Sequence, residues 1–319
     1  MHTASDHPTP SLRWCVAGAA WMVAAAWPAV AASAPLQVMA CEPEWAALVT
    51  ELAGDNAQVY RATNALQDPH RIEARPSLIA AARRADLLVC TGAELEAGWL
   101  PILLQQSGNP RIQPGRPGHF MATDQVPLRN VPKALDRAHG DVHAAGNPHI
   151  QTDPRNIERV ARSLVQRLSA IDPPRAETYR ARTTDFLLRW GQATTRWTQQ
   201  AAPLKGLPVV VQHDGFPYLE AWLGLRQVAT LEPKPGVEAS SAHLAGVISQ
   251  LAQQPARMVL RAAYNDGRSA EWLAQRTGLP VVVLPYTVGG NDQAGNLFAL
   301  FDNTVARLLN AAATPPVNP

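Results

Sequence analysis

The sequence predicts an α/β protein of two lobes, each a mostly parallel sheet flanked by helices, with one long helix joining the lobes. Short apolar runs alternate with amphipathic stretches in both halves of the chain, which is the rhythm of parallel strands covered by helices. A long segment with helical periodicity, 153–204, separates the two halves. With 319 residues, 46% of them hydrophobic, the chain is long enough for one or two domains with their own cores.

The first lobe is assigned to 35–172. Its predicted strands are apolar runs at 36–41, 57–61 and 86–91. The amphipathic stretches 43–54 and 75–85 between them predict helices. A Gly-, Pro- and His-rich loop of about 107–152 follows and has no clear periodicity.

The segment 153–204 is predicted to be helical except for a break at Pro173-Pro174. Its second half, from Glu177 to about Gln200, has 24 residues and at about 1.5 Å per residue is about 36 Å long, enough to span a domain. We therefore place the connecting helix at 173–204.

The second lobe is assigned to 205–312, where the same alternation resumes. The predicted strands are 207–212, 227–231, 257–262 and 280–286. The predicted helices are about 216–224, 240–253, 267–277 and 295–310. The remaining residues, 313–319, are expected to be a disordered tail.

The N-terminus predicts export. Arg13 precedes the apolar run "WCVAGAAWMVAAAWPAVAA", and Ala29-Val30-Ala31 matches an A-x-A cleavage pattern. The alternative is a membrane anchor, but the small-residue ending favours a cleaved signal peptide at 1–31. No later stretch reaches the roughly 18–20 apolar residues of a membrane span, and no lipobox cysteine follows the signal. We expect a soluble protein of the Gram-negative periplasm.

Cleavage would remove Cys15 and leave two cysteines, Cys41 and Cys90. Both end short apolar runs, so they would lie at the same edge of the sheet if those strands are neighbours. The geometry would suit a disulfide, which an oxidising compartment permits; two buried thiols are the alternative. Thiolate ligation of a metal is disfavoured because no C-x-x-C spacing exists.

Three histidines share a context that favours a ligand site. His70 lies in "QDPH", His149 lies in "GNPH", and His213 directly follows the strand-like run "LPVVVQ". In open α/β sheets ligands bind beyond the carboxyl ends of the strands, and proline stiffens the turns before the first two. The wide separations mean that such a site would form only when the lobes fold against each other.

Four motifs, in this order, resemble those of the periplasmic zinc/manganese-binding proteins of ABC transporters: "QDPHRIEARPS", "GNPHIQTDPRN", "VVVQHDGFPYL" and "LEPKPGVEASSAHL". The resemblance covers nearly all of the mature chain. It implies two α/β lobes, a rigid connecting helix and a metal site in the cleft between the lobes.

Carried over residue by residue, the resemblance makes His70, His149 and His213 metal ligands. The family's fourth ligand is usually an aspartate in a C-terminal loop. Asp292 stands at that place, although its surroundings "TVGGNDQAGNL" depart from the family's wording; Asp302, in an amphipathic helix, is the rival. Imidazole suits Zn²⁺ better than Mn²⁺, and manganese carriers of the family tend to have a carboxylate where His213 stands, so Zn²⁺ is expected over Mn²⁺.

Other carboxylates and histidines are candidates for supporting roles around the metal. Glu73, Asp153 and Asp214 are near enough in sequence to orient the imidazoles, although each is also explained as a solvated or helix-capping carboxylate. The long His-rich loop of many zinc carriers is reduced here to His139 and His143, which either collect metal weakly or belong to a flexible polar loop. His119 and His243 are read as structural.

The expected function is capture of zinc and delivery to an ABC permease in the inner membrane. A zinc hydrolase with an open three-histidine site is the alternative, as is a metal-binding adhesin or chaperone on the same fold. The chain lacks H-E-x-x-H and G-x-S-x-G, so we expect no enzyme. A formal net charge of +2 gives no indication of nucleic-acid binding. We expect a monomer, with a periplasmic metallochaperone as a further candidate partner.

Overall fold

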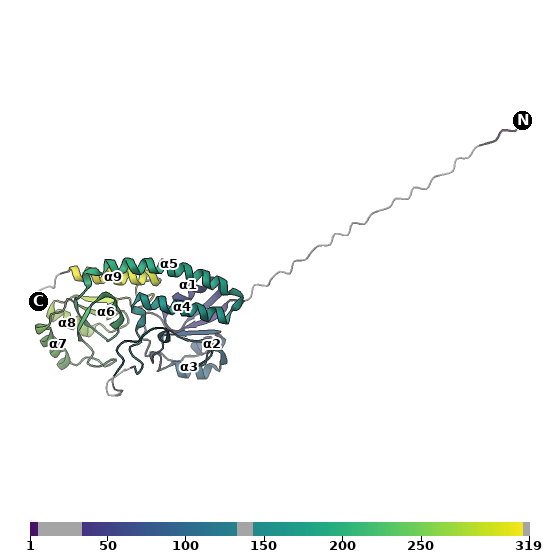
Figure 1. Ribbon diagram of the computed structural model, residues 1–319. Coiled ribbons are helices and arrows are strands. Elements are labelled where there is room, and N and C mark those ends of the chain that lie inside the picture. Colours follow the sequence, from purple (N-terminus) through teal and green to yellow (C-terminus); the bar gives the residue numbers. More distant parts are fainter. Residues whose placement is uncertain (6–33, 133–142, 315–319) are drawn as a thin grey trace. The chain divides into compact units, whose positions relative to one another are not determined.

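A computed structural model describes residues 1–5, 34–132 and 143–314 (Figure 1). Its contacts separate residues 1–34 from a compact body, 35–319, and the architecture below is that of the body. Most of the predicted signal peptide and most of the predicted tail, 313–319, lie outside the described residues. No helix of the described ranges is both long enough and apolar enough to cross a bilayer.

The body contains two parallel sheets of four strands each, so the predicted two-lobed α/β class is confirmed. The first sheet has the order β2-β1-β3-β4. Its strands are β1 (Leu36–Ala40), β2 (Ala57–Arg61), β3 (Leu87–Cys90) and β4 (His119–Met121). The short strand β4 lies inside the segment that was expected to be an irregular loop.

Helices cover both faces of this first sheet. They are α1 (Pro43–Ala53), α2 (Pro76–Arg84) and α3 (Leu100–Ser107). Alternate residues of β1 enter different cores, with Val38 packing on the side of α1 and Met39 on the side of α2 and α3. A strand buried on both faces needs a continuous apolar run, which is why the sequence reveals β1 and β3 so clearly.

The two cysteines form a disulfide between Cys41 and Cys90, with the Cα atoms 4.7 Å apart and a sequence separation of 49. Of the two possibilities left open by the sequence, the structure therefore has the bonded one. In the chain-entropy model a loop of this length stabilises the fold by about 4 kcal/mol.

The predicted helical segment consists of α4 (Pro154–Ile171), a single 3₁₀ turn (Pro173–Arg175) and α5 (Ala176–Gln200). The break falls at the two prolines, as expected. Asp153 caps α4 by accepting a hydrogen bond from the backbone N–H of Arg155, 2.9 Å away.

The helix α5 contacts both lobes, through α1 and α4 on one side and α9 on the other. Its buried face is a stripe at spacings of three and four residues: Tyr179, Thr183, Phe186, Trp190, Ala193 and Trp197. Trp190 and Trp197 pack against Phe301 of α9. One continuous hydrophobic core therefore contains residues of both sheets and of α5, which joins the lobes rigidly.

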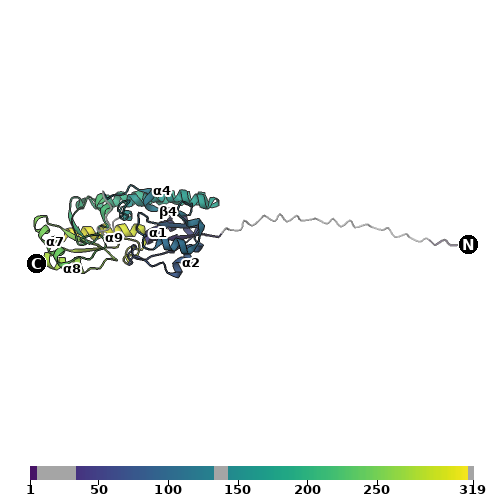
Figure 2. The ribbon, with the colours of Figure 1, turned by 90° about the horizontal axis from the view of Figure 1, so that it is seen from below.

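The second sheet has the order β6-β5-β7-β8, the same arrangement as the first. Its strands are β5 (Pro208–Val211), β6 (Arg226–Thr230), β7 (Met258–Ala262) and β8 (Val281–Leu284). The helices are α6 (Pro217–Leu223), α7 (Ser241–Gln253), α8 (Arg268–Thr277) and α9 (Leu297–Ala313). In Figure 2, α9 extends from this lobe toward α1, which it contacts. The exact lobe limits, 35–172, 173–204 and 205–312, stay predictions.

Candidate metal centre

His70 lies on the loop after β2, on a turn held at several points. The carboxylate of Asp68 accepts a hydrogen bond from the His70 backbone N–H, with Oδ1 and N 3.0 Å apart. The same Oδ1 lies 2.7 Å from the ring Nδ1. The carbonyl of Pro69 between them accepts a hydrogen bond from the indole of buried Trp99. Backbone and ring of His70 are therefore both oriented by the Asp-Pro pair in front of it.

His149 is placed by the same device. Oδ1 of Asn147 accepts a hydrogen bond from the His149 backbone N–H at 3.0 Å, so each Asx-Pro-His sequence is an Asx turn that aims its histidine. The Asn147 amide donates to the backbone carbonyl of Asp214 at 2.7 Å, which ties this turn to the segment that carries the third histidine. His149 is 1% exposed.

His213 follows β5 at the carboxyl edge of the second sheet. Its ring Nδ1 lies 2.8 Å from Oε2 of Glu232, which follows the neighbouring strand β6. Oε2 also accepts a hydrogen bond from the backbone N–H of Gly236. An imidazole with a carboxylate behind it is the usual arrangement of a metal-binding histidine.

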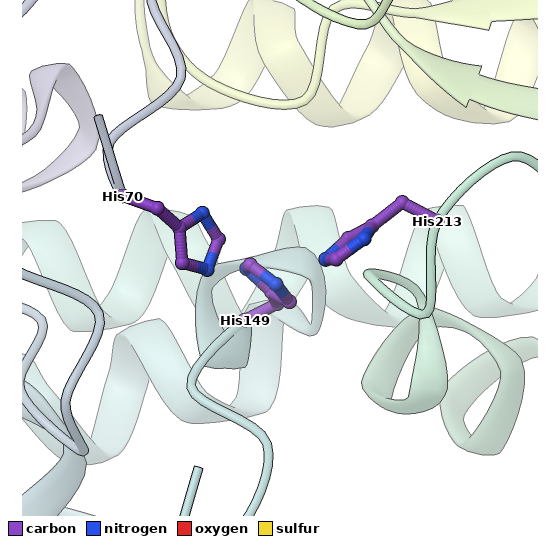
Figure 3. Close-up of side chains that lie close together, drawn as sticks. All are labelled: His70, His149 and His213. Atoms are coloured by element: carbon purple, nitrogen blue, oxygen red, sulfur yellow. The ribbon is translucent and has the colours of Figure 1, made fainter. Parts of the chain in front are cut away.

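The three histidines meet, as Figure 3 shows. One ring nitrogen of each of His70, His149 and His213 lies within 4.8 Å of the others. The ring centroids are 5.4–5.9 Å apart and the ring planes are steeply inclined. Across the described residues, the other possible group combines Cys41, Cys90 and Glu96, but its sulfurs are bonded to each other and offer no thiolates.

Burial and neighbouring charges shift the pKa values of these side chains in different directions. Burial, assisted by the neighbouring histidines, holds the pKa of His149 well below its usual range, so this ring is neutral, as a metal ligand must be. Burial also lowers the pKa of His213, but the hydrogen bond and charge of Glu232 outweigh it and raise the pKa. Burial raises the pKa of Asp68, yet its bonds to His70 outweigh that effect and lower it.

The donor set fits a metal cation. Nδ1 of His149 is buried and has no hydrogen-bond partner among the described residues, an unfavourable situation for a polar atom. Nitrogen ligands from three imidazoles suit Zn²⁺.

The structure does not bring Asp292 to the three histidines. It is an exposed residue of the loop between β8 and α9, and it lies outside the histidine group. The rival Asp302 is occupied elsewhere: it lies on α9, where Oδ1 accepts a hydrogen bond from the Trp197 indole at 2.6 Å and pairs with Arg196.

The remaining histidines outside the three-histidine group have different surroundings. His119 and His243 bond to the backbone carbonyls of Ile112 and Thr230, which agrees with their structural reading. His139 lies outside the described residues. His143, in contrast, has its Nε2 3.3 Å from Nε2 of His70.

The carboxylates that were predicted to orient the imidazoles are not the ones hydrogen-bonded to the rings. Glu73 is exposed, Asp153 caps α4, and Asp214 acts on His213 through its charge. The orienting carboxylates are Asp68 and Glu232. Asp68 stands in the quoted "QDPH" motif, and Glu232 follows a predicted strand, so the carboxyl-edge rule applied to acids would have found both.

The family described as "Zinc-uptake complex component A periplasmic" matches residues 38–311. Among curated relatives, the zinc-binding lipoprotein AdcA of Streptococcus pneumoniae (strain ATCC BAA-255 / R6) is 26% identical over 199 residues, which cover 61% of this chain and 38% of AdcA. The high-affinity zinc uptake system protein ZnuA of Bacillus subtilis (strain 168) is 22% identical over 230 residues, covering 68% and 67%. The manganese ABC transporter substrate-binding lipoprotein PsaA of Streptococcus pneumoniae serotype 4 (strain ATCC BAA-334 / TIGR4) is 20% identical over 257 residues, covering 79% and 80%. The chain thus spans well under half the length of AdcA.

Solved structures share the fold. A crystal structure of ZnuA superposes with a TM-score of 0.71 at 21% identity, covering 88% of this chain and 100% of that one. A periplasmic metal binding protein from candidatus liberibacter asiaticus has a TM-score of 0.70 at 16% identity, covering 86% and 98%. Because the family match runs through both sheets and all three clustered histidines, this chain belongs to the family of periplasmic zinc-uptake components.

Proposed function

We propose that this protein captures a divalent transition metal, zinc above all, and delivers it to an ABC-type permease. The observation that carries the proposal is the convergence of His70, His149 and His213, which are far apart in sequence but have ring nitrogens within 4.8 Å of one another. The metal is the cargo, and these three residues are its proposed ligands. Asp292, predicted from the resemblance, is left out of this set because it is exposed and apart.

Zinc is favoured over manganese by the donor atoms. Three imidazoles offer nitrogen only, whereas Mn²⁺ prefers carboxylate and water oxygens. The two nearby carboxylates, Asp68 and Glu232, bond to ring nitrogens and so act behind the ligands. The zinc-related names of AdcA and of the Bacillus ZnuA point the same way.

A route for the metal is available. An open pocket of about 400 Å³ is lined by His70 and His213 together with Asp68 and Glu232. Carboxylates along a pocket wall raise the local concentration of cations. A metal ion entering here would meet two of its proposed ligands directly.

Delivery to a permease is supported by the family and by the architecture. The family description places its members in the periplasm, and PsaA is named as the substrate-binding part of an ABC transporter. We propose the same location and an inner-membrane permease as partner, with the protein acting as a monomer and a periplasmic metallochaperone as a further donor. The continuous core along α5 favours a preformed site.

We propose no enzymatic activity. A catalytic zinc keeps an open position for water, so a hydrolase would bind zinc with three protein ligands and one water. If the protein is a carrier and not a hydrolase, the zinc-loaded protein should show no hydrolysis of activated esters above that of the His149→Ala variant.

The test of the proposed function is zinc binding by the purified chain without its predicted signal peptide, in competition with a chromophoric chelator. We expect one tightly bound zinc per chain and its loss in His149→Ala. His243→Ala is the matched control, because this histidine bonds to a backbone carbonyl away from the cluster. If wild type binds no zinc, or if His149→Ala binds it as tightly as wild type, the proposal is wrong. In the native host, deletion of the gene should lower zinc uptake under chelation, and wild type but not His149→Ala should restore it.

A further inference from the structure

A fourth histidine, His143, lies beside His70 at the edge of the three-histidine group. Its Nε2 is 3.3 Å from Nε2 of His70, and its ring centroid is 5.4 Å from that of His70 and 6.4 Å from that of His149. With Zn–N bonds near 2.0–2.1 Å, two imidazole nitrogens on one tetrahedral zinc are separated by about 3.3 Å. The His70–His143 pair therefore already has the edge length of such a shell.

Hydrogen bonds from the segment after β3 hold the ring of His143 and the residue that follows it. The backbone carbonyl of Ala93 accepts a hydrogen bond from it, and the carboxylate of Glu94 accepts one from the N–H of the next residue, Ala144, at 2.7 Å. A carbonyl that takes one ring N–H leaves the other nitrogen free for a metal. Two independent bonds thus fasten this end of the loop beside His70.

The backbone that supplies these bonds is strained. Gly92, Ala93 and Glu94, which follow β3, all have positive φ values, +87°, +47° and +67°. For the two residues that carry side chains, a positive φ is a strained conformation. Strain of this kind persists where the surrounding structure requires it, and here it aims the Ala93 carbonyl and the Glu94 side chain at the segment that carries His143.

The charges also suit a fourth imidazole. A zinc ion with four neutral histidines carries a formal charge of +2. The carboxylates of Asp68 and Glu232, bonded to the rings of His70 and His213, lie behind the ligands and offset part of this charge.

On these grounds we propose that His143 is the fourth protein ligand of the metal, closing a four-histidine shell. The inference rests on the proposed function. His143 lies outside the group whose nitrogens are all within 4.8 Å of one another, so binding must draw it toward His149 and His213. It is only partly buried, and Gly146, with φ +120°, gives the short connection to His149 freedom to adjust.

The experiment compares His143→Ala with Asp292→Ala, with His243→Ala as the control for loss of a histidine outside the site. Zinc affinity is measured by chelator competition. The imidazole count is measured by zinc-edge X-ray absorption and by the visible spectrum of the cobalt-substituted protein. We expect His143→Ala to weaken zinc by roughly 10–100-fold or more and to reduce the count from four imidazoles to three. Asp292→Ala should match wild type, and added free imidazole should restore the four-nitrogen cobalt spectrum of His143→Ala.

The inference is overturned if wild type shows three imidazoles, or if His143→Ala keeps its affinity while Asp292→Ala loses it. Either result would leave the proposed function standing, because that depends on tight zinc binding and its loss in His149→Ala. Circular dichroism of the metal-free variants at matched temperatures separates loss of a ligand from loss of the fold. If His143→Ala is unfolded, His143→Gln is used in its place, because glutamine keeps a polar side chain of similar size. The expected outcomes are the same.

Discussion

Asp68 contacts both the backbone and the ring of His70, with Oδ1 3.0 Å from the backbone N and 2.7 Å from Nδ1. A single carboxylate therefore fixes the turn and the orientation of the imidazole at once. Glu232, which follows a different strand, orients the ring of His213 through its contact with Nδ1. These two contacts explain why a site made of distant segments can exist before the metal arrives.

The Asp68→Ala variant should bind zinc about 10–100-fold more weakly than wild type, because the ring loses its orienting acceptor and the site loses a negative charge. Chelator competition at pH 7.5 measures the change. Glu73→Ala is the control, since Glu73 is close in sequence but exposed. Equal losses in the two variants would mean that general surface charge, and not the contact with His70, sets the affinity.

The Trp190→Ala variant should lower the free energy of unfolding by about 3–5 kcal/mol. Trp190 is 0% exposed, packs against Phe301 of α9 and donates its indole N–H to the carbonyl of Pro154. Leu188→Ala on the same helix should change the free energy by less than about 0.5 kcal/mol, because Leu188 is 64% exposed. Urea denaturation of the metal-free variants gives both values. Similar effects at the two positions would contradict the assignment of the buried face of α5.

Replacing Cys41 and Cys90 together by alanine should lower the free energy of unfolding by about 2–5 kcal/mol. Dithiothreitol should lower the melting temperature of wild type toward that of the double variant and leave the double variant unchanged. A wild type that melts at the same temperature with and without reductant would show that the bond between the two strand ends does not stabilise the fold.

Glu44 should make the stability of the metal-free protein fall as pH rises from about 4.5 to about 7. Burial raises the pKa of this carboxyl from 4.5 to about 7, against the opposing hydrogen bond from Thr287. Since the unfolded chain loses the proton near 4.5 and the folded chain near 7, the folded state binds more protons in this window, and the free energy of unfolding decreases with pH.

The Glu44→Gln variant removes this contribution, so its free energy of unfolding should depend less on pH than that of wild type. It should also be the more stable of the two at pH 8. Asp55→Asn, at an exposed carboxylate, is the control and should follow wild type. Parallel pH curves for wild type and Glu44→Gln would show that Glu44 titrates normally in the folded protein.

Much of the fold is predictable because its central strands, such as β1, β3 and β5, are buried on both faces. Residues such as Val38 and Val210 are almost inaccessible, and runs of this kind stand out in the sequence. The strand β4 escapes prediction because it has three residues, of which His119 and Met121 are only partly buried. The helix α3 also escapes prediction; it has eight residues and ends at the start of the segment read as a loop.

The part of the site that is formed by local turns can be predicted from the sequence. Each Asx-Pro-His sequence forms an Asx turn whose defining hydrogen bond joins residues two apart in the sequence. Glu232 meets His213 across the pairing of β5 with β6, and His143 meets His70 across 73 residues. The strand order that brings Glu232 to His213 follows the carboxyl-edge rule, whereas the contact of His143 with His70 and the exposure of Asp292 depend on how segments pack, and no local pattern contains them.

The most direct test of the central claim is a crystal of the zinc-loaded protein, with anomalous diffraction measured above and below the zinc edge. We predict one strong anomalous peak per chain, about 2.0–2.1 Å from a ring nitrogen of each of His70, His149 and His213. A peak elsewhere, or none at these three rings at full zinc occupancy in solution, would contradict the account.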